Sequence, residues 1–282
     1  MKKILIMSPT TVTGGGTQFC IGISKFLKSK KCRVYYVGPK DSEEFLKLTD
    51  ICDVVLDLNL KKFRPLVFFK IFLLIIQKNI DIVHSNGKVP GVYAYFYSLL
   101  FNKLRVIHTF HGIHYAQKSL VYRTLTFLIE KIFLGSNVIR HFVSFSEKCL
   151  FEQFFGVARN SVVIENTNFR EKELGCIDFT PTRDFYLYVG RITQVKNIDF
   201  IVKNIIQLNN EGVLKKTVKL NVVGFIDDTT LISKNDFIYQ ESIRELVSKQ
   251  DTNSAVDLLP ITSDPLAFIA SSLYMYMFIF FI

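Results

Sequence analysis

Short apolar runs alternate with longer amphipathic segments along almost the whole chain, and this alternation strongly constrains the fold. Runs of about five apolar residues are typical of buried strands, whereas apolar residues at helical spacing indicate helices. The expected elements are strands at residues 4–7, 34–37, 54–58, 80–83, 106–109 and 142–145, and helices at residues 17–29, 65–78 and 91–101. Ser146 is expected to cap the helix after the last of these strands. Such alternation predicts a parallel sheet with helices on both faces.

A second series of the same kind follows a polar stretch. Its expected strands are residues 185–189, 218–223 and 256–259, and its expected helices are residues 198–208 and 239–249. Residues 166–184 contain charged side chains, Gly175 and Pro181, a composition typical of a linker. We therefore predict an N-terminal domain over residues 1–165, a linker over residues 166–184 and a C-terminal domain over residues 185–282.

The two halves of the chain differ in charge. Residues 1–170 carry 24 Lys and Arg against 11 Asp and Glu, whereas residues 171–282 carry 11 against 14. The basic half favours an anionic partner, either a nucleic acid or an anionic membrane surface. No RNP, zinc-finger or helix-turn-helix pattern accompanies the charge, so we expect no nucleic acid and favour the inner face of the cytoplasmic membrane.

Two apolar segments bear on membrane attachment. Residues 65–77 are too short to span a bilayer and include Lys70, so we expect a buried or interfacial helix. The apolar run over residues 267–282 is interpreted as a helix end followed by a buried strand rather than as a membrane anchor. The protein is therefore expected in the cytoplasm, with peripheral membrane attachment.

Three consecutive glycines, Gly14, Gly15 and Gly16, separate the first expected strand from the first expected helix. Glycine lets a ligand approach the backbone, and the first N–H groups of a helix can bind an anion. A flexible turn would look similar in sequence. The G-x-G-x-x-G pattern of dinucleotide-binding proteins is absent, which argues against an NAD enzyme.

Polar residues follow other expected strands of the first series. Ligands of open α/β sheets bind beyond the carboxyl ends of the strands, so we expect His84 and His111 near the glycine turn, although a structural role suits His84 better. Asn166 lies at the edge of this crevice or simply in a turn. His108, His111 and His114 are close in sequence, but no carboxylate cluster accompanies them, so we expect no metal.

The second series opens with a strand that ends at Gly190 and is followed by Arg191 and Lys196 near an expected helix start. Arg and Lys beside the N-terminus of a helix place positive charge where a nucleoside diphosphate could bind. The alternative interpretation is that both are solvated surface charges.

Together these segments resemble the GT-B glycosyltransferases of glycosyltransferase family 4, of the type that builds bacterial surface polysaccharides such as capsule or O-antigen. The matching segments are the glycine turn, D-I-V-H-S-N, T-F-H-G, F-V-S-F-S, V-V-I-E-N, V-G-R-I-T-Q-V-K-N and L-N-V-V-G. The resemblance implies two Rossmann-like α/β domains with parallel sheets that face a cleft, with the nucleotide-sugar donor bound mainly by the second domain.

The resemblance also implies roles for individual residues. His111 would be the catalytic residue beside the transferred sugar. The implied donor-binding residues are Arg191 and Lys196 at the diphosphate, with Gly15, Gly16 and Asn166 lining the cleft. Because Arg and Lys would neutralise the leaving diphosphate, the family implies no metal or other cofactor, and the nucleotide-sugar is a substrate.

The sequence departs from the family pattern near its end. Members carry a Glu-x7-Glu segment after a late strand, whereas no glutamate follows Glu245 in this chain. We therefore expect an incomplete second domain and impaired activity.

The expected function is transfer of a sugar, with retention of configuration, from a nucleotide-sugar to a lipid-linked or growing surface polysaccharide. Two alternatives stay open. One is a non-catalytic remnant that binds a sugar nucleotide or glycan, and the other is a nucleotide-sugar 2-epimerase of the same fold.

Overall fold

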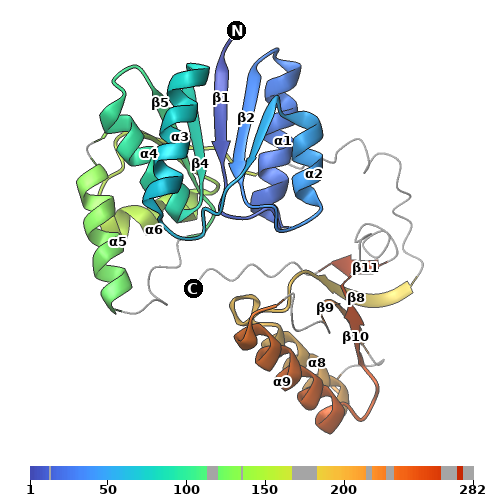
Figure 1. Cartoon of the computed structure of the whole chain (residues 1–282). Coiled ribbons are helices and arrows are strands. Elements are labelled where there is room, and N and C mark those ends of the chain that lie inside the picture. The colour runs from blue at the N-terminus through green and yellow to red at the C-terminus, as the bar shows by residue number, and fades with distance from the viewer. Residues whose placement is uncertain are drawn as a thin grey trace. The chain divides into compact units, whose positions relative to one another are not determined.

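The structure is a computed structural model that describes residues 1–12, 14–112, 120–134, 136–166, 183–213, 218–226, 232–261 and 272–275 (Figure 1). The chain forms two compact units, Met1–Phe169 and Arg170–Ile282. Both units are α/β, as the alternation of apolar runs predicts.

A seven-stranded parallel sheet forms the centre of the N-terminal unit, with the strand order β3-β2-β1-β4-β5-β6-β7. Its strands are β1 Lys3–Met7, β2 Arg33–Gly38, β3 Val54–Asp57, β4 Ile82–Asn86, β5 Arg105–Phe110, β6 Ile139–Phe142 and β7 Ser161–Val163. The order of the strands reverses between β1 and β4, and open α/β sheets bind ligands beyond the carboxyl ends of the strands at such a point.

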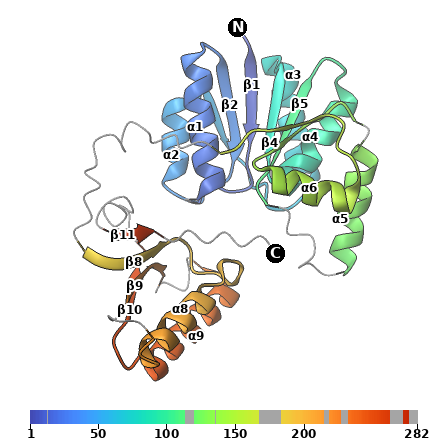
Figure 2. The same ribbon diagram turned by 180° about the vertical axis from the view of Figure 1, so that it is seen from behind.

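Helices cover both faces of this sheet because its strands are apolar on both sides. The helices are α1 Gly15–Ser29, α2 Glu44–Ile51, α3 Pro65–Lys78, α4 Lys88–Leu100, α5 Leu120–Phe133 and α6 Phe145–Phe155 (Figures 1 and 2). Along β1, Ile4 and Ile6 share a core with residues of α1 and α2. Leu5 and Met7 point to the other face and share a core with residues of α3 and α4.

The C-terminal unit contains a four-stranded parallel sheet with the order β10-β9-β8-β11. Its strands are β8 Arg183–Val189, β9 Lys219–Phe225, β10 Val256–Pro260 and β11 Ser272–Met275, and its helices are the short 3-10 helix η1 Gln194–Lys196, α8 Ile198–Asn210 and α9 Lys234–Gln250. Val202 and Ile206 of α8 and Ile243 of α9 share a core with Leu220 and Val222 of β9.

Two strands differ from the ranges expected from the sequence. The strand expected at residues 80–83 is β4, which runs to Asn86, so His84 lies inside the strand rather than beyond it. The strand expected at residues 142–145 is wrong because β6 ends at Phe142 and α6 begins at Phe145. The cap of α6 is Ser144, not Ser146, since the Oγ of Ser144 accepts a hydrogen bond from the backbone N–H of Glu147 at 3.1 Å.

The two apolar segments differ in how much of them is described. Residues 65–78 form α3, as expected. Within the C-terminal apolar run, Ser272–Met275 forms β11 and pairs in parallel with β8, whereas residues 267–271 and 276–282 lie outside the described residues. Among the helices that the structure describes, none combines the length and the hydropathy needed to cross a bilayer.

Candidate functional site

The glycine turn at the start of α1 has open space beside Gly15 and Gly16 among the described residues. Gly14 precedes α1, and no side chain caps this helix by a hydrogen bond. A Cβ atom added at Gly15 or Gly16 would meet no described atom within 4 Å, so contacts with the described residues do not require glycine at these positions. The exposed first turn can therefore present backbone N–H groups to an acceptor outside the protein.

The ends of β1, β4 and β5 meet beside this turn. The Nδ2 of Asn86 donates to the carbonyl oxygen of Met7 at the end of β1, at 3.4 Å. Gly87 has a φ of +78°, and a Cβ there would lie 2.9 Å from the ring of Pro9. Glycine is therefore needed where the segment after β4 contacts the segment after β1. Phe19 of α1 packs edge-on against the His111 ring, with the ring centroids 5.1 Å apart.

His111 follows the last residue of β5 and is held by Asn86. The Nε2 of His111 lies 3.1 Å from the Oδ1 of Asn86. Burial, with a smaller contribution from His141, lowers the pKa of His111 to about 4, so the ring is neutral near pH 7. The Oδ1 of Asn86 can only accept, so Nε2 carries the proton and Nδ1 keeps a lone pair that can accept a hydrogen bond from a ligand hydroxyl.

A chain of buried polar groups runs across the α1 face of the sheet next to His111. The Oγ1 of Thr109 lies 2.7 Å from the Nε2 of His84 and 3.0 Å from the Nδ1 of His141. The Nε2 of His141 lies 2.9 Å from the carbonyl oxygen of Ile164, to which it must donate. The single hydroxyl of Thr109 can donate to one of these two rings and accept from the other. His84 is therefore a structural residue, and burial lowers its pKa to about 3.

Glu147 fixes the loop that carries His111, a role that was not predicted from the sequence. Its two carboxylate oxygens accept hydrogen bonds from the backbone N–H groups of Gly112 and Val143, the second at 3.1 Å. The side chain is buried, and this burial raises the pKa of its carboxyl group. A capping box, Ser144-x-x-Glu147, was the available sequence signal.

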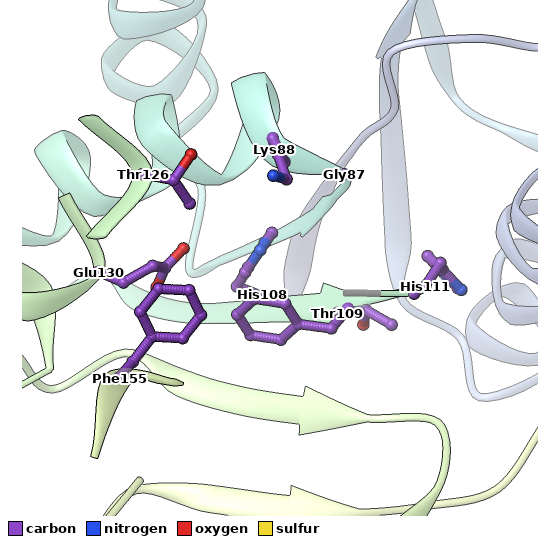
Figure 3. Close-up of a pocket in the computed structure, with 10 residues that line it drawn as sticks. Gly87, Lys88, His108, Thr109, His111, Thr126, Glu130 and Phe155 are labelled. Carbon is purple, nitrogen blue, oxygen red and sulfur yellow. The ribbon is translucent and has the colours of Figure 1, made fainter. Parts of the chain in front are cut away.

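A pocket lies on the other face of the sheet, next to the same loop (Figure 3). Figure 3 shows Thr126, Glu130 and Phe155 on one side of His108 and His111 on the other side. The Nδ1 of His108 lies 2.9 Å from the Oγ of Ser85, and burial lowers the pKa of His108 to about 3. The His108 ring also packs edge-on against Tyr95 of α4, with the ring centroids 5.7 Å apart.

Glu130 of α5 is the acidic group of this pocket. Burial raises the pKa of Glu130 to about 7, against the opposing effect of Arg140. The hydroxyl of Tyr95 donates to Glu130 Oε2 at 3.2 Å, and the guanidinium of Arg140 lies 5.9 Å from the centre of the Tyr95 ring. Arg140 is fully buried. These groups come from α4, α5 and β6 and form one polar cluster.

In the C-terminal unit, Arg191 and Lys196 lie on the short segment between β8 and α8. Arg191 is exposed, and Lys196 is half-buried at the end of η1. Asn197 precedes α8 with a φ of 51° and makes no side-chain capping hydrogen bond. The hydroxyl of Tyr239 accepts from the backbone N–H of Asp199 at 3.2 Å. Lys196 thus lies just before the N-terminus of α8, whereas Arg191 follows the end of β8.

Gly190 and Gly224 allow a close approach of β8 and β9 next to Arg191. The backbone N–H of Gly190 donates to the carbonyl oxygen of Val223 at 3.1 Å. A Cβ at Gly224, which has a φ of +140°, would lie 1.9 Å from the carbonyl oxygen of Gly190. The glycine of L-N-V-V-G is therefore required by the close approach of the V-G-R segment.

The structure places the remaining predicted residues as follows. Asn166 is exposed beyond the end of β7, and its role stays a prediction. His114 lies outside the described residues. Within the described part of the chain, no three His, Cys, Asp or Glu side chains form a metal-binding group.

Solved structures share this architecture over nearly the whole chain. A glycosyltransferase from Rickettsia africae matches with a TM-score of 0.68 and 19% identity, covering 97% of this chain and 72% of that chain. Sucrose-phosphate synthase from Thermosynechococcus elongatus matches with a TM-score of 0.69 and 15% identity, covering 96% of this chain and 74% of that chain. Anabaena HepE, solved with UDP, matches with a TM-score of 0.70 and 15% identity, covering 98% of this chain and 73% of that chain. The fold is that of a GT-B protein with two Rossmann-like domains.

The family follows from the sequence itself. The model of Glycosyltransferase Family 4 matches residues 13–167, which is more than half of the chain. The chain therefore belongs to Glycosyltransferase Family 4. A search of curated proteins gave no match.

Proposed function

We propose that the protein transfers a sugar, with retention, from a nucleoside diphosphate sugar to a lipid-linked or growing surface polysaccharide at the inner face of the cytoplasmic membrane. The observation that carries this proposal is the neutral His111, held by Asn86 at the carboxyl ends of β4 and β5 in a chain of this family. A neutral imidazole with an acceptor nitrogen suits a sugar hydroxyl.

The cations of the C-terminal unit supply the second half of the proposed chemistry. When the glycosidic bond of the donor breaks, negative charge develops on the leaving diphosphate. Arg191 and Lys196, just before α8, would stabilise that charge by charge-assisted hydrogen bonds, so the transfer would need no metal. HepE is solved with UDP and with UDP-glucose, which supports a nucleoside diphosphate sugar as the donor.

The glycine turn and the charge distribution bear on the acceptor. The space beside Gly15 and Gly16, which no described side chain fills, leaves room for a phosphate or an acceptor group near the N-terminus of α1. The excess of basic residues in the N-terminal half would attract an anionic lipid surface, where a lipid-linked acceptor resides. We therefore place acceptor binding in the N-terminal unit, whereas Asn166 keeps its predicted role among the donor-binding residues.

The test is a turnover assay with the purified chain, a panel of nucleoside diphosphate sugars and a lipid-linked glycan extract. Transfer predicts release of nucleoside diphosphate that depends on the acceptor, and NMR of the product gives its anomeric configuration. Interconversion of the donor sugar without an acceptor would identify a 2-epimerase instead. Tight donor binding without either reaction would identify a non-catalytic binding protein.

A further inference from the structure

Helix α3 is apolar on its outer side as well as on its inner side. Val67, Ile71, Leu74 and Ile75 are buried against the sheet, as expected for a helix of an α/β layer. On the opposite side, four large apolar side chains are exposed, namely Leu66, Phe69, Leu73 and Ile76. A helix that faces water on one side normally carries polar residues there, so this pattern requires a second explanation.

The neighbouring helices extend the exposed apolar surface. Phe68 of α3 stacks on Tyr97 of α4 with ring centroids 4.8 Å apart, and Phe96 of α4 contacts Phe133 of α5 with centroids 5.8 Å apart. Both views show these three helices side by side (Figures 1 and 2). The exposed large apolar residues described on α4 and α5 are Phe96, Leu99, Leu100, Leu120, Val121, Leu125, Leu128 and Ile132. Together with the four residues of α3 they form what we call the α3–α4–α5 face.

This face is far more apolar than an ordinary protein surface. Leu66 is 78% exposed, Val121 is 80% exposed and Ile132 is 72% exposed. Scattered apolar residues are normal on a surface, but a contiguous patch of this kind marks a site of interaction with a protein or a membrane.

The charge around the face distinguishes between these partners. Residues 61–134 contain 11 Lys and Arg, and their only acidic residues are Asp81 and Glu130. Glu130 accepts a hydrogen bond from the buried Tyr95, so it does not offset the cations at the surface. Lys70, Lys103 and Lys131 are exposed on or beside the three helices. The combination of apolar and cationic side chains matches an anionic lipid surface.

We propose that the α3–α4–α5 face is the membrane-docking surface and that its apolar side chains enter an anionic lipid leaflet. The inference rests on the membrane association in the proposed function and names the surface responsible. At 14 residues α3 is about 21 Å long, too short to span a bilayer, so it would lie in the interface. Lysine stems can follow the apolar surface while their charged ends reach lipid phosphates.

A second copy of the chain is the competing occupant of this face. Two-fold pairing would place the same surface on both sides of the interface. The cations of one copy would then lie opposite the cations of the other, with no acidic side chains on the three helices except Glu130. Charge complementarity therefore favours lipid.

The test is flotation of the full chain with vesicles of phosphatidylglycerol and phosphatidylcholine. The variant Phe69→Ser/Leu73→Ser removes two exposed side chains of the face. The matched control is Phe26→Ser/Leu46→Ser, which removes two exposed apolar side chains from α1 and α2, on the other face of the sheet. The face variant should bind vesicles about tenfold or more weakly than the wild type, whereas the control should differ by less than about twofold.

Three outcomes overturn the proposal. The first is that the face variant binds vesicles as well as the wild type does. The second is that the control loses as much vesicle binding as the face variant. The third is that the wild type is a dimer in sedimentation velocity and the face variant is a monomer, while both bind vesicles equally well. Calorimetry with UDP on the same proteins distinguishes a failure of the docking surface from a failure of the proposed function. If the face variant no longer binds vesicles but still binds UDP, the result supports the docking surface. If the wild type binds vesicles but binds neither UDP nor any other nucleoside diphosphate, the result refutes the proposed function and leaves the docking surface intact.

Discussion

Thr109 joins two buried histidine rings and so stabilises the sheet edge that carries His111. Its hydroxyl is within hydrogen-bond distance of His84 and His141 and is itself fully buried. Thr109→Val keeps the shape of the side chain but leaves the Nε2 of His84 and the Nδ1 of His141 without this partner. An unsatisfied buried polar group costs about 1–3 kcal/mol, so we expect a loss of stability of that order in the N-terminal unit.

Chemical denaturation followed by circular dichroism would measure the effect of Thr109→Val. Thr124→Val is the matched control, because Thr124 is exposed on α5 and its hydroxyl donates to the carbonyl oxygen of Leu120 within the same helix. The control should change the free energy of unfolding by less than about 0.5 kcal/mol. Equal effects of the two substitutions would contradict the role given to the histidine chain.

Arg191 and Lys196 give the residue-scale prediction for the donor. Removing one charge-assisted contact to a phosphate costs about 1.5–3 kcal/mol. Arg191→Ala and Lys196→Ala should therefore each weaken the binding of a nucleoside diphosphate by about tenfold or more. Lys249→Ala is the control, because Lys249 pairs with Glu245 at the far end of α9. Isothermal titration calorimetry that gives unchanged affinity for both variants would refute the assignment.

At the scale of elements, the contact between β8 and β9 depends on glycine. Gly224→Ala would bring a Cβ to 1.9 Å from the carbonyl oxygen of Gly190, so the two strands must separate. Gly212 also has a positive φ, +66°, but a Cβ there would meet no described atom within 4 Å. Gly212→Ala therefore carries only the cost of the left-handed conformation, about 1 kcal/mol.

We expect Gly224→Ala to destabilise the C-terminal unit by about 3 kcal/mol or more, clearly beyond the effect of Gly212→Ala. Thermal unfolding of both variants measures the difference. Because Gly190 directly precedes Arg191, the affinity for nucleoside diphosphate should fall in Gly224→Ala as well. Equal melting temperatures for the two variants would show that the close approach of β8 to β9 does not require glycine at position 224.

The elements that the sequence predicts best are those with a continuous apolar pattern. The range of α3 was predicted to the residue, and β1 and β2 within one residue, because buried parallel strands and the helices on them are rich in apolar residues. The end of β4 was missed because His84, Ser85 and Asn86 look like a loop. Their buried hydrogen bonds to distant residues make them tolerable in a strand, and one sequence does not reveal such partners.

The same limit applies to the candidate site. His111 was identified because it follows a strand end, which is a local signal. Glu147 and Asn86 were not assigned roles, because each acts on a segment more than 20 residues away. The linker over residues 166–184 and the roles of Gly15, Gly16 and Asn166 stay predictions, and residues 167–182 lie outside the described part of the chain.

For the whole molecule, the uneven charge predicts how membrane binding responds to salt. Residues 1–170 carry 24 Lys and Arg against 11 Asp and Glu, and exposed cations near an anionic leaflet contribute about 1 kcal/mol each. Lys70, Lys103 and Lys131 alone would then supply about 3 kcal/mol, or about a hundredfold in partitioning. Because the screening length shortens from about 30 Å at 0.01 M salt to about 3 Å at 1 M, most of this contribution should be lost at high salt.

Flotation with anionic and with neutral vesicles across a salt series measures this effect. Binding to anionic vesicles should fall steeply as the salt concentration rises, and neutral vesicles should bind weakly at every concentration. The variant Lys70→Gln/Lys131→Gln should show a shallower salt dependence, because it removes two of the cations and leaves the apolar side chains in place. Equal binding to both vesicle types at low salt would contradict the electrostatic contribution and would assign membrane binding to apolar side chains alone.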